Sequence, residues 1–197
     1  MKKTLVFTFV LVVLIVGIYI YYRNHNSVVI TVPVSDGSVC HDSTRYFAIE
    51  KSLAPNVGSN ILIKYKTSPE EKLPCVYAVA NGDFEPPNVE AQYFLAFTDN
   101  FILLDSGTAP EPRGLIVYDL RSRKQVFTDS YAKPVIVVGD TITYLSKTSI
   151  EPTAQNCPDL KTYTSNGLGA VIMSKVTVDL KTLFKKDAGM FECKATQ

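Results

Sequence analysis

The residues of this sequence best suited to chemistry are four cysteines, Cys40, Cys75, Cys157 and Cys193. No two of them are closely spaced, whereas structural zinc sites present pairs of ligands from short turns, so zinc is not predicted. In an exported protein four such cysteines form two disulfides. Three connectivities are open. The more local one, Cys40 with Cys75 and Cys157 with Cys193, is favoured because it ties each end of the domain to itself.

A catalytic thiol would need a neighbouring base or cation to lower its pKa. His41 beside Cys40 and Lys194 beside Cys193 are neighbours in sequence only. The run Cys40-His41-Asp42 could hold a metal or a nucleophile and its base, but adjacent residues of a strand point to opposite faces. We expect His41 to be a surface loop residue beside a disulfide.

The acidic residues are spread through predicted loops: Asp83, Glu85, Glu90, Glu111, Glu151 and Asp159. A glycosidase would need two of them about 5 to 10 Å apart in a cleft, which the sequence leaves open as an alternative. Asp99, Asn100 and Asp105 lack the spacing of a calcium-binding loop. No nucleophile elbow or phosphate-binding glycine loop is present. We therefore predict no catalytic residue, no cofactor and no metal.

The N-terminus decides the compartment. Thr4 to Tyr22 is an uncharged 19-residue run, long enough as a helix to cross the hydrocarbon core of a bilayer. Lys2 and Lys3 precede it, which places the N-terminus in the cytoplasm. A cleaved signal peptide is the rival interpretation, but no small-residue cleavage pattern follows the run. We expect an uncleaved signal-anchor over residues 1–23, a linker over 24–27 and an exported domain over 28–197, in the periplasm or outside the cell.

The charge balance excludes one class of partner. The chain carries 20 Lys and Arg against 19 Asp and Glu. Without Lys2 and Lys3 the rest has a net charge of 18 − 19 = −1. Nucleic-acid binding depends on clustered cations that face phosphates, so it is not expected.

The exported part alternates short apolar or β-branched runs with Gly, Pro, Asn and Asp, which is typical of strands and turns. The predicted strands are Val28–Val34, Arg45–Glu50, Asn60–Lys66, Cys75–Ala80, Glu90–Thr98, Phe101–Ser106, Leu115–Leu120, Gln125–Asp129, Pro134–Val138, Thr141–Ser146, Ala170–Leu180 and Met190–Lys194. Turns are predicted at Asn81-Gly82, Gly139-Asp140 and Asn166-Gly167. The fold class is all-β, with one antiparallel domain after the anchor.

A hairpin recurs in the chain. IVYDLRSRKQVF (116–127) and VTVDLKTLFKKD (176–187) share a strand, then Asp-Leu, then a basic turn. Asp119 and Asp179 should accept backbone N–H groups and close each turn, while the next Leu returns to the core. Residues 61–77 form a related third unit with Tyr65 in place of the Asp. Each of three units would open with a strand such as RYFAIE, QYFLAF or TITYLS.

The stretch from Gln92 to Ser146, with YFLAFTDNFILL, GLIVYDLRSRKQVF and PVIVVGDTITYL, resembles the hairpins of a β-propeller blade. Closed propellers need at least four blades, so a sandwich or a partial propeller-like stack of about three units is expected. The C-terminal stretch, NCPDLKTYTSNGLGAVIMSKVTVDLKTLF to FECKATQ, is similar to the tail of small exported bacterial proteins, a resemblance that implies no activity. The expected function is a non-enzymatic envelope module that binds a protein or a cell-wall component, and the alternative is an exported hydrolase.

Overall fold

The computed structural model describes residues 30–33 and 37–197. The predicted anchor from Thr4 to Tyr22 and the linker over 24–27 lie outside these residues. Within the described part of the chain, no helix is long and apolar enough to cross a membrane. The all-β, antiparallel fold class is confirmed, because every strand pair is antiparallel and the described residues contain one short helix.

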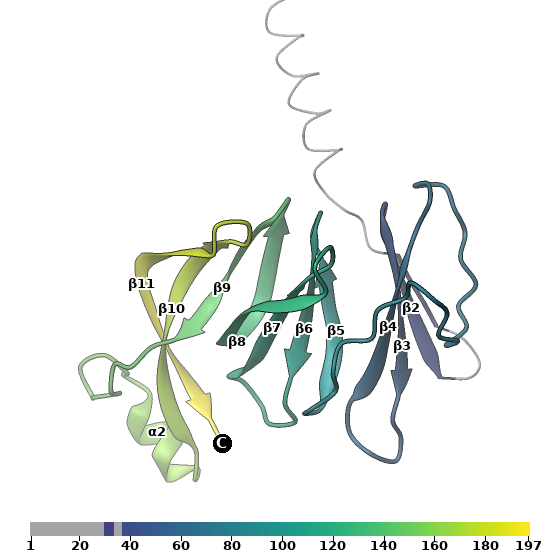
Figure 1. The fold of residues 1–197 in the computed structure, drawn as a ribbon. Coiled ribbons are helices and arrows are strands. Elements are labelled where there is room, and N and C mark those ends of the chain that lie inside the picture. The colour runs from purple at the N-terminus through teal and green to yellow at the C-terminus, as the bar shows by residue number, and fades with distance from the viewer. Residues whose placement is uncertain (1–29, 34–36) are drawn as a thin grey trace, which may run out of the picture.

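The strands form two sheets, seen side by side in Figure 1. The first has the order β1-β2-β3-β4 and the second the order β11-β10-β9-β8-β7-β6-β5. The elements are β1 (Ile30–Pro33), β2 (Ser38–Asp42), β3 (Tyr46–Ser52), β4 (Ser59–Tyr65), β5 (Gln92–Phe97), β6 (Phe101–Ser106), β7 (Arg113–Asp119), β8 (Lys124–Val138), β9 (Thr141–Lys147), α2 (Leu160–Ser165), β10 (Gly169–Asp179) and β11 (Phe184–Thr196).

The second sheet folds back on itself at β8. Its pairing with β9 loses register between Ala132 and Ile136, around Pro134, which has no backbone N–H to donate. As a result, β6 and β7 pack face to face against β9 and β10 of their own sheet. The domain therefore has three layers: β1–β4, then β5–β7 with the first half of β8, then the rest of β8 with β9–β11.

The middle layer is covered on both faces, and β6 shows this most clearly. Ile102 and Leu104 pack towards the first sheet, with Tyr46 among their neighbours. Phe101 and Leu103 pack towards the third layer, with Tyr144 among theirs. All six residues of β6 are buried, and because both faces are covered, its first four residues, FILL, form a continuous apolar run and not an alternating one.

Several predicted strands need correction. Cys75–Ala80 forms no strand. Its side chains alternate, with Cys75 and Tyr77 against the first sheet, but its backbone bonds are local, from the Val76 N–H to Pro74 and from Ala78 to Val76. The alternation of buried and exposed side chains thus results from packing of this segment on the sheet, although its backbone does not pair with a strand of the sheet.

The strand β2 (Ser38–Asp42) was not predicted, and the other differences concern strand length. Gln125–Asp129 and Pro134–Val138 are both parts of β8, which continues through its bend, and Met190–Lys194 is the end of the longer β11. The helix α2 was not predicted. It contains no buried residue, so it lacks the apolar stripe by which a helix is recognised in a sequence.

Candidate functional site

Four turns meet at one end of the second and third layers, and two of their backbone contacts are equivalent. The N–H of Leu120 donates to the carbonyl of Asn100 at 3.0 Å, and the N–H of Leu180 donates to the carbonyl of Asp140 at 2.9 Å. Each bond joins the turn after an Asp-Leu strand to the turn before the neighbouring strand. The repeated sequence therefore builds the same local structure twice.

The predicted roles of Asp119 and Asp179 are confirmed. Asp119 Oδ1 accepts the N–H of Ser122 at 2.6 Å, and Asp179 Oδ1 accepts the N–H groups of Lys181 and Thr182 at 2.9 and 3.1 Å. Leu120 and Leu180 are buried in the core. Carboxylates at these strand ends thus close the turns.

The first unit keeps the contact with different residues. The Lys66 N–H donates to the carbonyl of Arg45 at 2.9 Å, and Tyr65, which replaces the Asp, reaches the carbonyl of Leu120 with its hydroxyl at 2.6 Å. The expected register of the second unit was wrong by one strand. Asn100 directly precedes β6, as Arg45 directly precedes β3. The second unit therefore opens with β6 and not with QYFLAF.

Asp140 is the polar centre of this end of the domain. Its carboxylate accepts the Thr98 hydroxyl at 2.7 Å, the Asn100 N–H at 3.0 Å and the Asn100 side-chain amide at 2.6 Å. Lys181 Nζ lies 3.0 Å away. Burial alone would raise the pKa of Asp140, but the hydrogen bonds from Thr98, Asn100 and Lys181 outweigh it and lower this pKa below its ordinary value.

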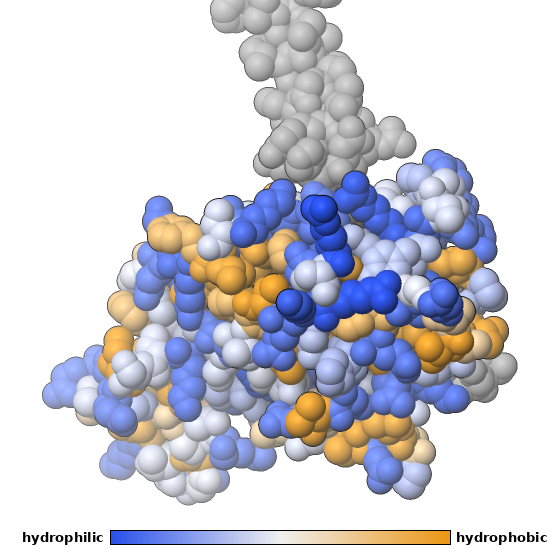
Figure 2. Space-filling view, in the orientation of Figure 1, coloured by the Kyte–Doolittle hydropathy of each residue, from blue (hydrophilic) through white to orange (hydrophobic). Residues whose placement is uncertain are grey.

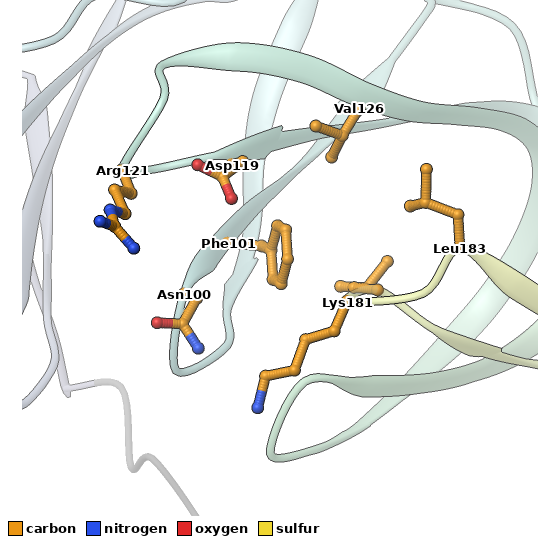
Figure 3. A pocket seen from close by; sticks show the side chains of 8 residues that line it. Asn100, Phe101, Asp119, Arg121, Val126, Lys181 and Leu183 are labelled. Atoms are coloured by element: carbon orange, nitrogen blue, oxygen red, sulfur yellow. The ribbon is translucent and has the colours of Figure 1, made fainter.

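Asn100 and Lys181, which both bind Asp140, also line a cavity of about 360 Å³ (Figure 3). We call it the turn pocket. It is lined by Asn100, Phe101, Asp119, Arg121, Val126, Leu180, Lys181 and Leu183. Phe101 and Leu180 are buried and form an apolar floor. Arg121 and Lys181 place two cations at the rim, of which Lys181 is paired with Asp140. Arg121 is exposed and has no hydrogen bond or ion pair to any residue that the structure describes.

The lining of the turn pocket suits binding better than catalysis. It contains no Ser, Thr, Cys or His that could act as a nucleophile or base. Its one carboxylate, Asp119, already closes a turn. What the pocket offers is a cationic rim over an apolar floor, which complements an acidic group carried on a small apolar body.

The four predicted disulfide cysteines are paired as favoured, Cys40 with Cys75 and Cys157 with Cys193, and no cysteine is free in the described residues. Two disulfides indicate an oxidising compartment, extracellular or periplasmic. The first fastens the segment after β4 to the outer face of the first sheet. The second fastens the loop before α2 to β11.

The expectation for His41 was wrong. It lies in β2 and is 7% exposed, its ring stacks on that of Phe94 at 3.8 Å, and Nε2 lies 3.1 Å from Glu50 Oε2. Cys40 does point to the opposite face, into another cluster. The flanking disulfide suggested a loop, but pairing with Glu50 across the sheet allowed the imidazole to be buried.

The other candidate residues do not come together. Asp105 pairs with Arg113 and Lys133 and not with Asn100. Of the loop acids, Asp83 binds Lys64, Glu85 accepts the Tyr77 hydroxyl, Glu90 accepts that of Ser106 and Glu111 accepts the Lys133 N–H. Glu151 and Asp159 lie in the loop before α2. Residues 30–33 and 37–197 contain no group of three His, Cys, Asp or Glu able to hold a metal.

One arrangement that sequence reasoning missed has the distances of a nucleophile and base. Lys185 Nζ lies 2.8 Å from Ser146 Oγ. However, Ser146 is 2% exposed, and Lys185 is ion-paired with Asp129 at 2.7 Å. Tyr144 also donates to Asp129, at 2.6 Å. This is a partly buried structural network that ties β11 to β8 and β9, and no sequence pattern marked its members.

The comparisons identify no relative: no known family model, curated protein or solved structure matches the chain.

Proposed function

We propose that this protein is an exported, non-enzymatic binding module held to the membrane by an uncleaved helix over Thr4 to Tyr22. Its N-terminus lies in the cytoplasm and its β domain in the periplasm or outside the cell. The two disulfides support the oxidising side for the domain, and the length of the apolar run supports a membrane span.

We further propose that the three layers are successive blade-like units in a partial stack. The bond of Lys66 to Arg45 has the same place in the first unit as that of Leu120 to Asn100 in the second and that of Leu180 to Asp140 in the third. This recurrence supports three related units. It also brings the turns of neighbouring units to one end, where they can form a shared surface.

The partner binds at the turn pocket. The observation that carries this proposal is the unpaired, exposed state of Arg121. Its guanidinium is exposed and unpaired among the described residues, above the apolar floor of Phe101 and Leu180. An arginine in this setting recognises a carboxylate or phosphate. The partner is a protein or cell-wall component that presents an acidic group beside a short apolar segment.

Affinity capture tests this proposal. The full chain carrying a C-terminal tag is expressed in its own cells, extracted in detergent and compared with Arg121→Glu and with Lys161→Glu, a matched charge reversal on exposed α2. We expect a bound component that is retained by the wild-type chain and by Lys161→Glu but lost from Arg121→Glu.

The same preparation separates the binding module from the alternative exported hydrolase. Turnover of a cell-wall glycan or ester by the wild-type chain, abolished by substitution of a loop carboxylate such as Glu151, would overturn the proposal. Capture that Arg121→Glu leaves unchanged would overturn the role of the turn pocket.

A further inference from the structure

A second cavity, of about 350 Å³, lies on the face of the middle layer that is turned towards the first sheet. We call it the edge pocket. It opens where the first sheet ends: beyond β4, the described residues continue the sheet with a single bridge, between Ile63 and Phe84. The loop with Pro87 and Val89 borders the cavity, and residues of β5 to β8 form its floor.

Gln92 is the unusual residue of the edge pocket. This residue is 2% exposed, yet its amide Nε2 has no hydrogen-bond partner among the residues that the structure describes. A buried donor without an acceptor costs about 1–3 kcal/mol, so such a group points to a partner that is not part of the chain.

The backbone around Gln92 is firmly positioned. Gly58, at a positive φ of 92°, lies so close to this segment that an added Cβ would be 2.9 Å from Ala91 Cα and 3.2 Å from the backbone nitrogen of Gln92. On the other side, the N–H of Gly107 donates to the carbonyl of Ala91 at 2.7 Å. The backbone that carries Gln92 is therefore fixed at the start of β5, as that of a preorganised binding residue should be.

The neighbours of Gln92 define the kind of ligand. Glu90 Oε2 accepts the hydroxyl of Ser106 at 3.2 Å, and this carboxylate lines the same pocket. Gln125 and Thr128 add an amide and a hydroxyl, and the lining contains no Lys or Arg. The pocket therefore has no cation that could bind an anion. Its side chains fit a neutral ligand that accepts a hydrogen bond from an amide and donates one to a carboxylate.

We propose that the edge pocket binds one sugar ring of a cell-wall or surface glycan. A sugar hydroxyl accepts from Gln92 Nε2 and donates to Glu90, and an N-acetyl group does both through its carbonyl and N–H. Ile116, which is partly buried, supplies an apolar contact for the ring, whereas Tyr118 is 5% exposed and packs against Phe84. This proposal rests on the proposed function, because it takes the chain to be a binding module. The edge pocket is nevertheless a separate site from the turn pocket.

The test uses the full chain in a detergent without a sugar headgroup, with N,N′-diacetylchitobiose and cellobiose as probes at millimolar concentration. Saturation-transfer NMR should show binding of at least one of them. Glu90→Gln and Gln92→Met should weaken that binding about fivefold or more, as expected for one lost hydrogen bond. Glu85→Gln, a carboxylate outside the pocket in the same loop, and Arg121→Glu should leave it unchanged.

Two results would overturn the sugar site: no binding of either probe, or binding that neither pocket variant weakens. The near-UV circular dichroism of each variant establishes that it is folded. Failure here leaves the capture experiment at Arg121 unaffected. Conversely, sugar binding with no component captured at the turn pocket would sustain the edge pocket alone.

Discussion

The carboxylate of Asp140 and the ammonium of Lys181 lie 3.0 Å apart, so the turn before β9 is joined to the turn after β10 directly beside the turn pocket. Asn100, from the turn before β6, binds the same carboxylate at 2.6 Å. One acidic side chain thus holds turns of two layers together. The shape of the turn pocket depends on it.

Asp140→Ala is therefore expected to lower the free energy of unfolding by about 2 kcal/mol, because it strands the buried donors of Thr98 and Asn100. Urea unfolding of the full chain in micelles, followed by near-UV circular dichroism of its tyrosines, measures this loss. Asp99→Ala is the matched control. Asp99 adjoins the same turn without a hydrogen bond to another described residue, and its removal should cost less than about 0.5 kcal/mol.

The partly buried network at Asp129 predicts a pH dependence. Burial acts to raise the pKa of Asp129, but hydrogen bonds from Lys185, Tyr144 and Ser146 outweigh burial and lower it. The folded pKa then lies below the unfolded value of about 3.9. The contribution of Asp129 is fully present above that pH and is lost as the pH falls through the folded pKa.

Urea unfolding between pH 6 and pH 2.5 checks this sign. The wild-type chain should lose stability more steeply below about pH 4 than Asp129→Asn does. Glu70→Gln removes an exposed carboxylate and should leave the wild-type profile unchanged. Equal slopes for wild type and Asp129→Asn would contradict the role of the network.

The three-layer packing predicts that two adjacent residues of β6 are equally intolerant of truncation. Leu103 and Leu104 are both 0% exposed but face opposite neighbours. Leu103→Ala and Leu104→Ala should each cost about 2–5 kcal/mol. In a two-layer sandwich one of the two would face solvent and cost little, so a large difference between them would contradict the stack. Val89→Ala, at a residue that is 88% exposed, is the control.

Each disulfide should contribute about 2–4 kcal/mol, since each closes a loop of 35 or 36 residues. The double variants Cys40→Ser/Cys75→Ser and Cys157→Ser/Cys193→Ser measure these contributions separately. Peptide mapping without reductant should recover the two pairs and no alkylated cysteine. Free thiols in the native chain would contradict both the pairing and the oxidising compartment.

Much of the fold could be predicted because local patterns decide it. Phe101–Ser106 was predicted with its observed bounds, and the Asp-Leu turns were predicted with the correct role for Asp119 and Asp179. Both depend on residues close in sequence. The errors arose where contacts between residues distant in sequence determine the structure. The alternation around Tyr77 results from packing on the first sheet. His41 is buried because it contacts Glu50 and stacks on Phe94.

The site was the least predictable part. Gly139-Asp140 could be recognised as a turn, and Gly139 has the positive φ of 56° that such a turn requires. Nothing in the sequence indicated that Asp140 would gather Thr98, Asn100 and Lys181, because the folding back of the second sheet at β8 brings these residues together. The orphaned amide of Gln92 likewise exists only once β5 is packed.

Site-specific photo-crosslinking in intact cells tests the central claim most directly, with a photoreactive amino acid placed at position 121 of the full chain and, as control, at position 161 of α2. Arg121 lies at one side of the turn pocket (Figure 3). Apolar side chains also gather over the upper part of the β8–β11 layer, among charged ones (Figure 2). We predict one discrete adduct from position 121 and none from position 161. The same adducts from both positions, or none from either, would contradict recognition at the turn pocket.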